Sequence, residues 1–388
     1  MTSFSVRLLV IAPILMGMIS CVSMKPFGAE DGLRLEEDEK RLWNRSKELV
    51  ERLDKSGELY RDPVLTAYVN DVAKKLVPEN LKQRGLSFQI KILKNPLMNA
   101  FALAHGTIYL HTGLLAKMEN EAQLATLLGH EMSHAIDRHQ LQQFRTVQNT
   151  AGTLTAIQII FMPFGVFGSI GSLLAAGGAL AAVSGYSRAQ ETEADTQGLA
   201  LTVAAGYDPK EAPRLFDHLK RDLEESKKDE PFFFGNHPRL AERKDSYNRL
   251  LEEKYAGVAG AKGAEGFMER ISNLLLDNAA FDMSLGRFAL AQEAIEKFLQ
   301  NQPRSGTGHY YLGEVWRQKN PDGDLAKAEN EYKEAAEYDP ALAPPHRGLG
   351  LIWLKLGKKQ DAKRAFEKYL SLAPTAAEIG RASCRERV

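Results

Sequence analysis

Residues 126–139, TLLGHEMSHAIDRH, constrain this chain most, because they place two histidines four positions apart in a helix-forming run. Apolar residues recur at helical spacing through the run, no proline interrupts it, and Asn120 with Gln123 forms a helix-start signal. His130 and His134 are therefore expected on one helix face, where both imidazoles can point at one metal ion. Imidazole nitrogens suit zinc, and two of them leave room for a third protein ligand and a water.

Glu131 completes the pattern HExxH and is predicted as the catalytic base. It lies about 100° round the helix from His130, from where its carboxylate can take the proton of a water that attacks a peptide carbonyl. The pattern alone also occurs as two surface histidines beside a glutamate. Here the histidines adjoin an apolar stripe, and burying them without a metal or a carboxylate would be costly, so metal binding is favoured. The metzincin pattern HExxHxxGxxH does not fit, because Asp137 replaces its glycine and Gln140 its third histidine.

The third ligand is expected from residues 187–201, SRAQETEADTQGLAL, a second predicted helix. Glu191 and Asp195 are four positions apart and share a face. A carboxylate is an acceptable third zinc ligand, and a second one a turn later can hold a ligand imidazole by its other nitrogen. We predict these two roles for Glu191 and Asp195, while Glu193 faces elsewhere. Taken alone, the pattern is better explained as a solvated acidic helix start.

HExxH followed by ExxxD resembles the gluzincin metallopeptidases of the CAAX prenyl protease/HtpX family. Three other segments are similar to that family, namely Asn99-Ala100-Phe101 to its substrate-side edge strand, residues 187–195 to its third-ligand helix, and His237-Pro238 with Arg243 to its downstream HP…R. The resemblance spans about residues 45–250. It is closest to the periplasmic BepA- and LoiP-like branch, which is soluble or lipid-anchored.

The resemblance implies a zinc endopeptidase with one zinc ion, held by His130, His134 and Glu191. The implied fold class is α+β, a mostly helical zincin-type domain with a small sheet, followed by an all-α TPR solenoid. The resemblance also implies that the substrate binds along Asn99, Ala100 and Phe101. It implies a catalytic role for His237, and it implies that Arg243 orients the site or binds substrate carbonyls. His237 either stabilises the oxyanion or, as a fourth ligand, keeps the site latent.

The segments that precede the HExxH helix are predicted as alternating helices and strands. Amphipathic helices are expected over 35–53 and 62–76, strands over 87–94, 99–103 and 107–110, a turn over 104–106, and a short helix opening at 113. His139 is expected to make a structural hydrogen bond rather than to bind metal. No role is assigned to His105 or His111.

Residues 1–20 are predicted as a lipoprotein-type signal peptide. Arg7 precedes an apolar run that ends in MISC, residues 18–21, which resembles a bacterial lipobox with Cys21 as the lipidated residue. Residues 21–34 would then be a tether that anchors the chain to a membrane facing the periplasm. Val22 in place of Asp suggests, by resemblance, the outer membrane. The alternative is an ordinary signal peptide with an incidental cysteine.

Residues 150–184 are almost uncharged and rich in glycine and alanine. They are either a membrane-inserted hairpin or two buried helices broken at Pro163 and Gly165, and their composition favours a role in the core or as a lid. We assign 35–255 to the peptidase domain and the Gly/Ala-rich stretch 256–266 to a linker.

Residues 267–377 are predicted to form three TPR repeats. Small and large residues recur in the TPR pattern at Gly313, Ala328, Tyr332, Ala335 and Pro340, again at Gly350, Ala362, Phe366 and Pro374, and more weakly at Ala279, Ala291, Ile295 and Pro303. Such a solenoid offers a concave groove for peptides or a partner protein, although a purely structural appendage shares the pattern. Residues 378–388 resemble a translated sequencing adapter, so Cys384 is not expected to be native and no disulfide is expected.

These features predict a zinc endopeptidase of the bacterial cell envelope that is lipid-anchored in the periplasm, at the outer membrane. Its expected substrates are misfolded or stalled envelope proteins, with a further protein partner in the TPR groove. Lys and Arg total 50, as do Asp and Glu, which leaves no charge excess for nucleic acid. The alternative is a TPR scaffold or assembly chaperone with a latent zinc site, and a third hypothesis is an integral membrane protease.

Overall fold

The computed structural model describes residues 26, 35–83, 86–151, 185–226, 240–320 and 323–374. Several predictions from the sequence lie outside these residues. They are the signal peptide with Cys21, nearly all of the tether, the apolar stretch from 152 to 184, His237, and residues 378–388. Within the described part of the chain, helices dominate and the sheet is small, so the predicted fold class is confirmed.

The sheet has three strands, β1 (Gln89–Leu93), β2 (Ala100–Ala102) and β3 (Thr107–His111), in the order β1-β3-β2. β1 pairs with β3 in parallel and β2 pairs with β3 antiparallel, so β2 is an edge strand, as predicted. The turn between β2 and β3 requires Gly106, which has φ +95° and whose Cβ would lie 2.5 Å from the Ser87 carbonyl oxygen. The edge strand is therefore held by a turn that other residues would strain.

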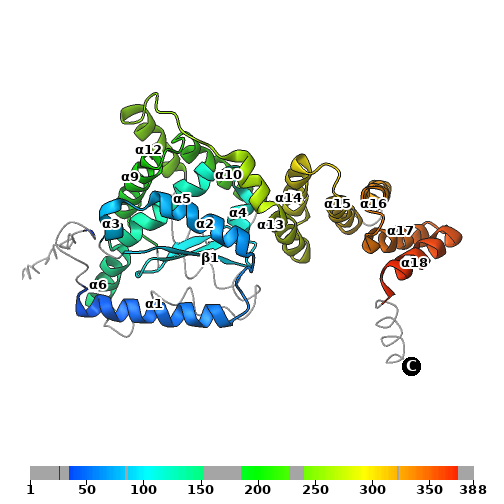
Figure 1. Ribbon diagram of the computed structural model, residues 1–388, viewed down its shortest axis with the longest axis horizontal. Helices are drawn as coiled ribbons and strands as arrows, with labels where there is room; N and C mark the ends of the chain where they lie inside the picture. The colour runs from blue at the N-terminus through cyan, green and yellow to red at the C-terminus, as the bar shows by residue number, and fades with distance from the viewer. Residues whose placement is uncertain are drawn as a thin grey trace, which may run out of the picture.

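Helices cover both faces of the sheet (Figure 1). One face packs on α1 (Glu37–Lys55) and α6 (His139–Ala151) through Leu42, Leu49, Phe101, Tyr109 and Phe144. The other face packs on α2 (Pro63–Leu76), α4 (Thr112–Lys117) and α5 (Glu121–Ile136) through Leu65, Val69, Ile90, Ile108 and Leu128. α3 (Glu79–Gln83) follows α2. Alternate residues of each strand thus serve two cores, which is the period of a strand buried on both faces.

The HExxH helix is α5, and it begins at the predicted cap. The Asn120 side chain accepts from the Gln123 N–H at 3.0 Å, while the Gln123 side chain accepts from the Glu119 N–H at 2.9 Å. The helix ends three residues before the end of the 126–139 run that the periodicity suggested. α5 ends at Ile136, Arg138 has a left-handed φ of 59°, and α6 begins at His139. The chain therefore changes direction a few residues after His134.

α9 (Arg188–Ala204), α10 (Glu211–Ser226) and α12 (Leu240–Glu253) complete the peptidase domain. The predicted linker then lies along this domain instead of hanging free. The Ala261 N–H donates to the Gly206 carbonyl at 2.9 Å, and the Ala122 N–H, at the start of α5, donates to the Lys262 carbonyl at 3.0 Å. The segment that leads into the TPR region is therefore fixed to both α5 and the end of α9.

Three helix pairs follow and extend away from the peptidase domain (Figure 1). They are α13 (Ala264–Ser284) with α14 (Phe288–Asn301), α15 (Gly306–Lys319) with α16 (Leu325–Tyr338), and α17 (Ala343–Lys355) with α18 (Lys359–Leu372). Phe267, Ile271 and Leu274 of α13 belong to the same hydrophobic core as the peptidase helices, so the first pair is docked. None of the helices in the described ranges is both long and apolar enough to cross a membrane.

Candidate metal centre

Three predicted ligands converge between α5 and α9. His130 Nε2 and His134 Nε2 are 3.0 Å apart, and each lies 3.7 Å from a different oxygen of Glu191. All three side chains are buried. Zinc bound tetrahedrally at about 2.0–2.1 Å would separate its donor atoms by roughly 3.3 Å, so spacing and chemistry both fit this ion.

The two helices that carry these ligands approach each other through glycine. A Cβ on Gly129 would lie 2.6 Å from the Gly198 carbonyl oxygen, and a Cβ on Gly198 would lie 2.6 Å from the His130 backbone nitrogen. Backbone therefore meets backbone one residue before His130. Sequence reasoning overlooked this pair, although glycines inside two predicted helices were a visible signal of close approach.

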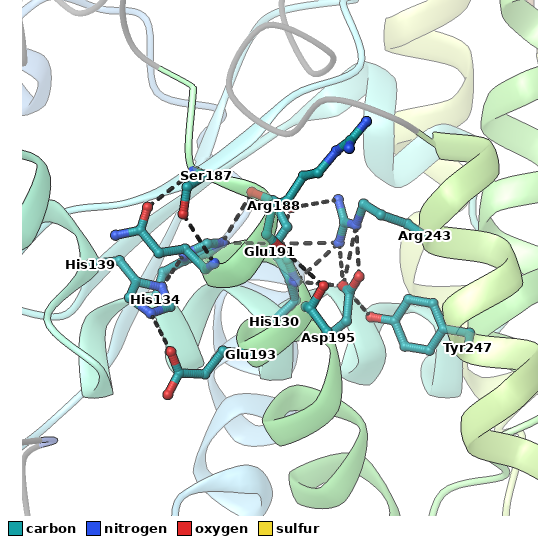
Figure 2. Close-up of polar contacts among 12 residues, drawn as sticks. His130, His134, His139, Ser187, Arg188, Glu191, Glu193, Asp195, Arg243 and Tyr247 are labelled. Carbon is teal, nitrogen blue, oxygen red and sulfur yellow. Dashed lines mark hydrogen bonds and ion pairs between the residues drawn. The ribbon is translucent and has the colours of Figure 1, made fainter. Parts of the chain in front are cut away.

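Asp195 lies one turn after Glu191 and faces His130. His130 Nδ1 is 2.9 Å from Asp195 Oδ1, so a ring whose Nε2 faces the metal donates its Nδ1–H to this carboxylate. Arg243 Nη2, at 2.6 Å, and the Tyr247 hydroxyl, at 2.8 Å, donate to the same oxygen (Figure 2). Although burial raises the pKa of Asp195, the charge of Arg243 and the hydrogen bond from His130 hold it well below its usual range.

Arg243, predicted from the sequence to bind substrate or to orient the site, is engaged by the carboxylates. Its Nη1 lies 3.3 Å from Glu191 Oε2, and its guanidinium lies 4.7 Å above the Phe216 ring centroid. The side chain is only 5% exposed. This placement favours the orienting role, because the guanidinium links the third ligand to Asp195. Tyr247, which shares α12 with Arg243, carried no signal in the sequence.

Tyr186 is a second residue that sequence reasoning missed. Its ring stacks on the His134 imidazole, with centroids 3.9 Å apart and 15° between the planes. Burial has the largest effect on the pKa of Tyr186 and raises it far above its usual value, and the charges of Glu131 and Glu191 raise it further. The tyrosine therefore lies at the metal centre as a neutral phenol. It directly precedes the cap of α9, Ser187, and so is positioned by the start of the third-ligand helix.

The residues predicted to bind substrate form the edge of the sheet, but their side chains are buried. Asn99 is 1% exposed, Ala100 is fully buried, and Phe101 is 5% exposed with its ring stacked on Tyr109 at 5.2 Å. These side chains build the core and leave little surface for a ligand. A substrate at this edge would therefore pair with the β2 backbone, whose partner in the described sheet is β3 alone.

The fold and this site define a metallopeptidase domain of the zincin type. Residues 63–249 match peptidase family M48, and residues 282–341 match a tetratricopeptide repeat. The chain therefore carries an M48 peptidase domain followed by TPR repeats, and the family resemblance seen in the sequence is confirmed.

Named relatives agree with this assignment. The chain is 32% identical to mitochondrial metalloendopeptidase OMA1 of Arabidopsis thaliana, over 47% of this chain and 37% of that protein. It is 28% identical to the beta-barrel assembly-enhancing protease of Escherichia coli K12, over 52% of this chain and 42% of that protein. It is 30% identical to metalloprotease LoiP of the same organism, over 42% of this chain and 62% of that protein. The chain thus spans about two fifths of the length of the first two relatives.

Proposed function

We propose that this chain is a zinc-dependent endopeptidase whose metal ligands are His130, His134 and Glu191. The observation that carries the proposal is the convergence of these three buried donors, with Glu131 next to one of them on α5. When bound, zinc would polarise the attacking water and the scissile carbonyl. Two imidazoles and one carboxylate leave a coordination position open for that purpose, as catalytic zinc sites do.

The remaining steps belong to the side chains of this chain. Glu131 takes the proton of the attacking water and then delivers it to the leaving amine. Asp195, held by Arg243 and Tyr247, keeps the His130 ring in the tautomer that leaves Nε2 free to bind metal. The substrate lies as an added strand on the backbone of β2. His237 is outside the described residues, so its two alternative roles stay predictions.

We further propose that the enzyme works in the bacterial cell envelope on misfolded or stalled envelope proteins. Support comes from the relatives named beta-barrel assembly-enhancing protease, and from the lipobox-like sequence MISC that ends at Cys21. The docked TPR array supports a protein partner or substrate held near the peptidase domain. The proposed location is the periplasm, with a lipid anchor at Cys21 in the outer membrane.

The test is Glu131→Gln, with zinc content and casein cleavage measured on the same preparation. We expect zinc to stay bound and cleavage to fall by about 10²–10⁴-fold, the usual contribution of a general base. Glu51→Gln, at an exposed position of α1, is the matched control and should cleave as the wild type does. Cleavage undiminished in Glu131→Gln would refute the mechanism. A zinc-loaded wild type that cleaves nothing would favour the assembly chaperone with a latent site.

A further inference from the structure

A second polar cluster lies against the metal centre, next to His134. It consists of Asp137, His139 and Glu193, each of which offers a ligand atom within 4.8 Å of the others. None of them has a part in the steps above. His139 reaches this place because the chain turns at Arg138, whose left-handed backbone starts α6 directly after α5. The guanidinium of Arg138 is tied to Glu39 of α1, which holds the turn.

The cluster reaches His134 through His139. His139 Nδ1 lies 2.8 Å from His134 Nδ1, and His139 Nε2 lies 3.2 Å from Glu193 Oε2 (Figure 2). His139 is fully buried, whereas the Glu193 side chain is 48% exposed. The His134 nitrogen that faces away from the metal site therefore contacts the His139 imidazole. The other nitrogen of His139 contacts the Glu193 carboxylate.

Counting protons leaves one arrangement for two neutral rings. A metal-binding Nε2 on His134 carries no proton, so the proton of this ring is on Nδ1 and is donated to His139 Nδ1. The single proton of His139 must then be on Nε2, where it is donated to Glu193. Each hydrogen bond from His134 through His139 to Glu193 then has one donor and one acceptor. The reversed tautomers are unfavourable, because an unprotonated His139 Nε2 would face the Glu193 carboxylate, which is also an acceptor.

We propose that His139 and Glu193 are positioning residues that set the tautomer and ring orientation of His134. They correspond to Asp195, which contacts His130 directly, but they act through one additional ring. The inference rests on the proposed zinc site. Because the Glu193 side chain is half exposed while Asp195 is 1% exposed, water screens the charge of Glu193 more strongly. His139 should therefore matter more than Glu193 does.

The competing explanation is a second cation held by Asp137, His139 and Glu193. Asp137 is 2% exposed, and neither of its oxygens makes a hydrogen bond of ordinary geometry within the described ranges, although the Gln197 amide is close enough to influence it. A cation on His139 Nε2 would displace the proton donated to Glu193. With zinc on His134 as well, the two rings would share one proton, and one of them would have to be an imidazolate. The hydrogen-bonded arrangement needs no such species.

The experiment measures how fast zinc is lost to excess chelator, together with the visible spectrum of the cobalt-substituted protein. His139→Leu removes the acceptor for His134, and we expect zinc loss to be about 10–100-fold faster, with a changed cobalt spectrum. His139→Asn offers an amide oxygen near the place of Nδ1 and should restore most of the wild-type behaviour. Glu193→Ala should give a smaller, several-fold acceleration. Asp137→Asn, in the same cluster but outside the proton chain, is the matched control and should match the wild type.

Several outcomes would overturn the proposal. A folded His139→Leu that loses zinc at the wild-type rate would do so, and if that variant does not fold, an unchanged Glu193→Ala decides against it equally. Two metal ions per chain, falling to one in Asp137→Asn, would establish the second cation instead. A wild type that binds no zinc overturns the proposed function and this inference together, whereas zinc-loaded wild type with unaffected variants overturns only this inference.

Discussion

The helix crossing at the metal centre and the crossings in the TPR array both depend on glycine, but glycine contacts different partners. At the α5–α9 crossing, Gly129 and Gly198 bring two backbones together. In the TPR array, a Cβ on Gly313 would lie 2.6 Å from the Tyr332 ring, and one on Gly350 2.6 Å from the Phe366 ring. An aromatic side chain can shift by a few tenths of an ångström, whereas a helix backbone cannot. The α5–α9 crossing therefore fixes the separation of its two helices, and the TPR crossings fix only how well their side chains pack.

The same contrast applies to charge. The metal centre buries Glu191, Asp195 and Arg243 almost completely, and each depends on the others. The TPR array has a comparable group, in which Tyr332 and Arg317 contact Glu314, but the Arg317 side chain is 27% exposed. Water can replace a lost partner there, and it cannot do so at the metal centre.

The largest expected effect comes from glycine replacement. Gly198→Ala should abolish zinc binding, because the methyl group would force α9 away from α5 and separate Glu191 from the histidines. Gly313→Ala, facing a ring, should leave zinc content unchanged and destabilise only the TPR array. Gly266→Ala, in α13 with no atom within 4 Å of the added Cβ, is the control and should stabilise by about 0.5–1 kcal/mol.

Zinc content and urea unfolding of the three variants check this prediction. Full zinc occupancy in Gly198→Ala would show that α5 and α9 can move apart without loss of the site. The α5–α9 crossing would then be no more rigid than the crossings in the TPR array.

Removal of a buried cation should have the next largest effect. Arg243→Met leaves the carboxylates of Asp195 and Glu191 buried without their cation, and breaking such a buried pair costs about 3–5 kcal/mol. Arg317→Met in the TPR array should cost about 1 kcal/mol or less, because that pair is partly solvated.

Urea unfolding of the zinc-free proteins measures both costs, since bound zinc would partly neutralise the carboxylates in Arg243→Met. Equal losses in the two variants would contradict the assigned difference in solvation.

The smallest expected effect is an opposite response of the two regions to pH. Burial lowers the pKa of His111, on β3, to about 4. Its neutral form therefore contributes stability above pH about 6.5, and at most about 3 kcal/mol of it is lost as the pH falls to 4. Burial opposes a charge on His309, in α15, but the Pro303 carbonyl and the Glu331 carboxylate prevail and raise its pKa. His309 therefore contributes stability below pH about 6.5, which is lost as the pH rises through its raised pKa.

Amide hydrogen exchange at pH 5 and pH 7.5, corrected for intrinsic rates, should show β3 less protected and α15 more protected at the lower pH. His111→Asn should weaken the change in β3 and leave α15 as in the wild type. Parallel changes in both elements would refute the two opposite pKa shifts.

Much of the architecture could be predicted because it is encoded in short-range patterns. The strand that becomes β2, its turn at Gly106, the cap of α5 at Asn120 and the three TPR helix pairs all follow local spacing, and the structure contains each of them. The place of β2 at the edge of the sheet was implied by the family resemblance and not by local spacing. The end of α5 was predicted too late. The apolar and polar pattern continues past Ile136, and the left-handed backbone at Arg138, which pairs with Glu39 of a distant helix, breaks the helix instead.

By itself, the sequence determined which residues could hold a metal, because HExxH and ExxxD each place two side chains on one helix face. Only the tertiary structure decided how those groups meet and what supports them. Gly129 against Gly198, Tyr186 on His134 and Tyr247 on Asp195 are contacts between segments far apart in the chain. The physical reason is that helical periodicity defines which face a residue occupies, while the partner of that face is selected by close packing of the whole domain.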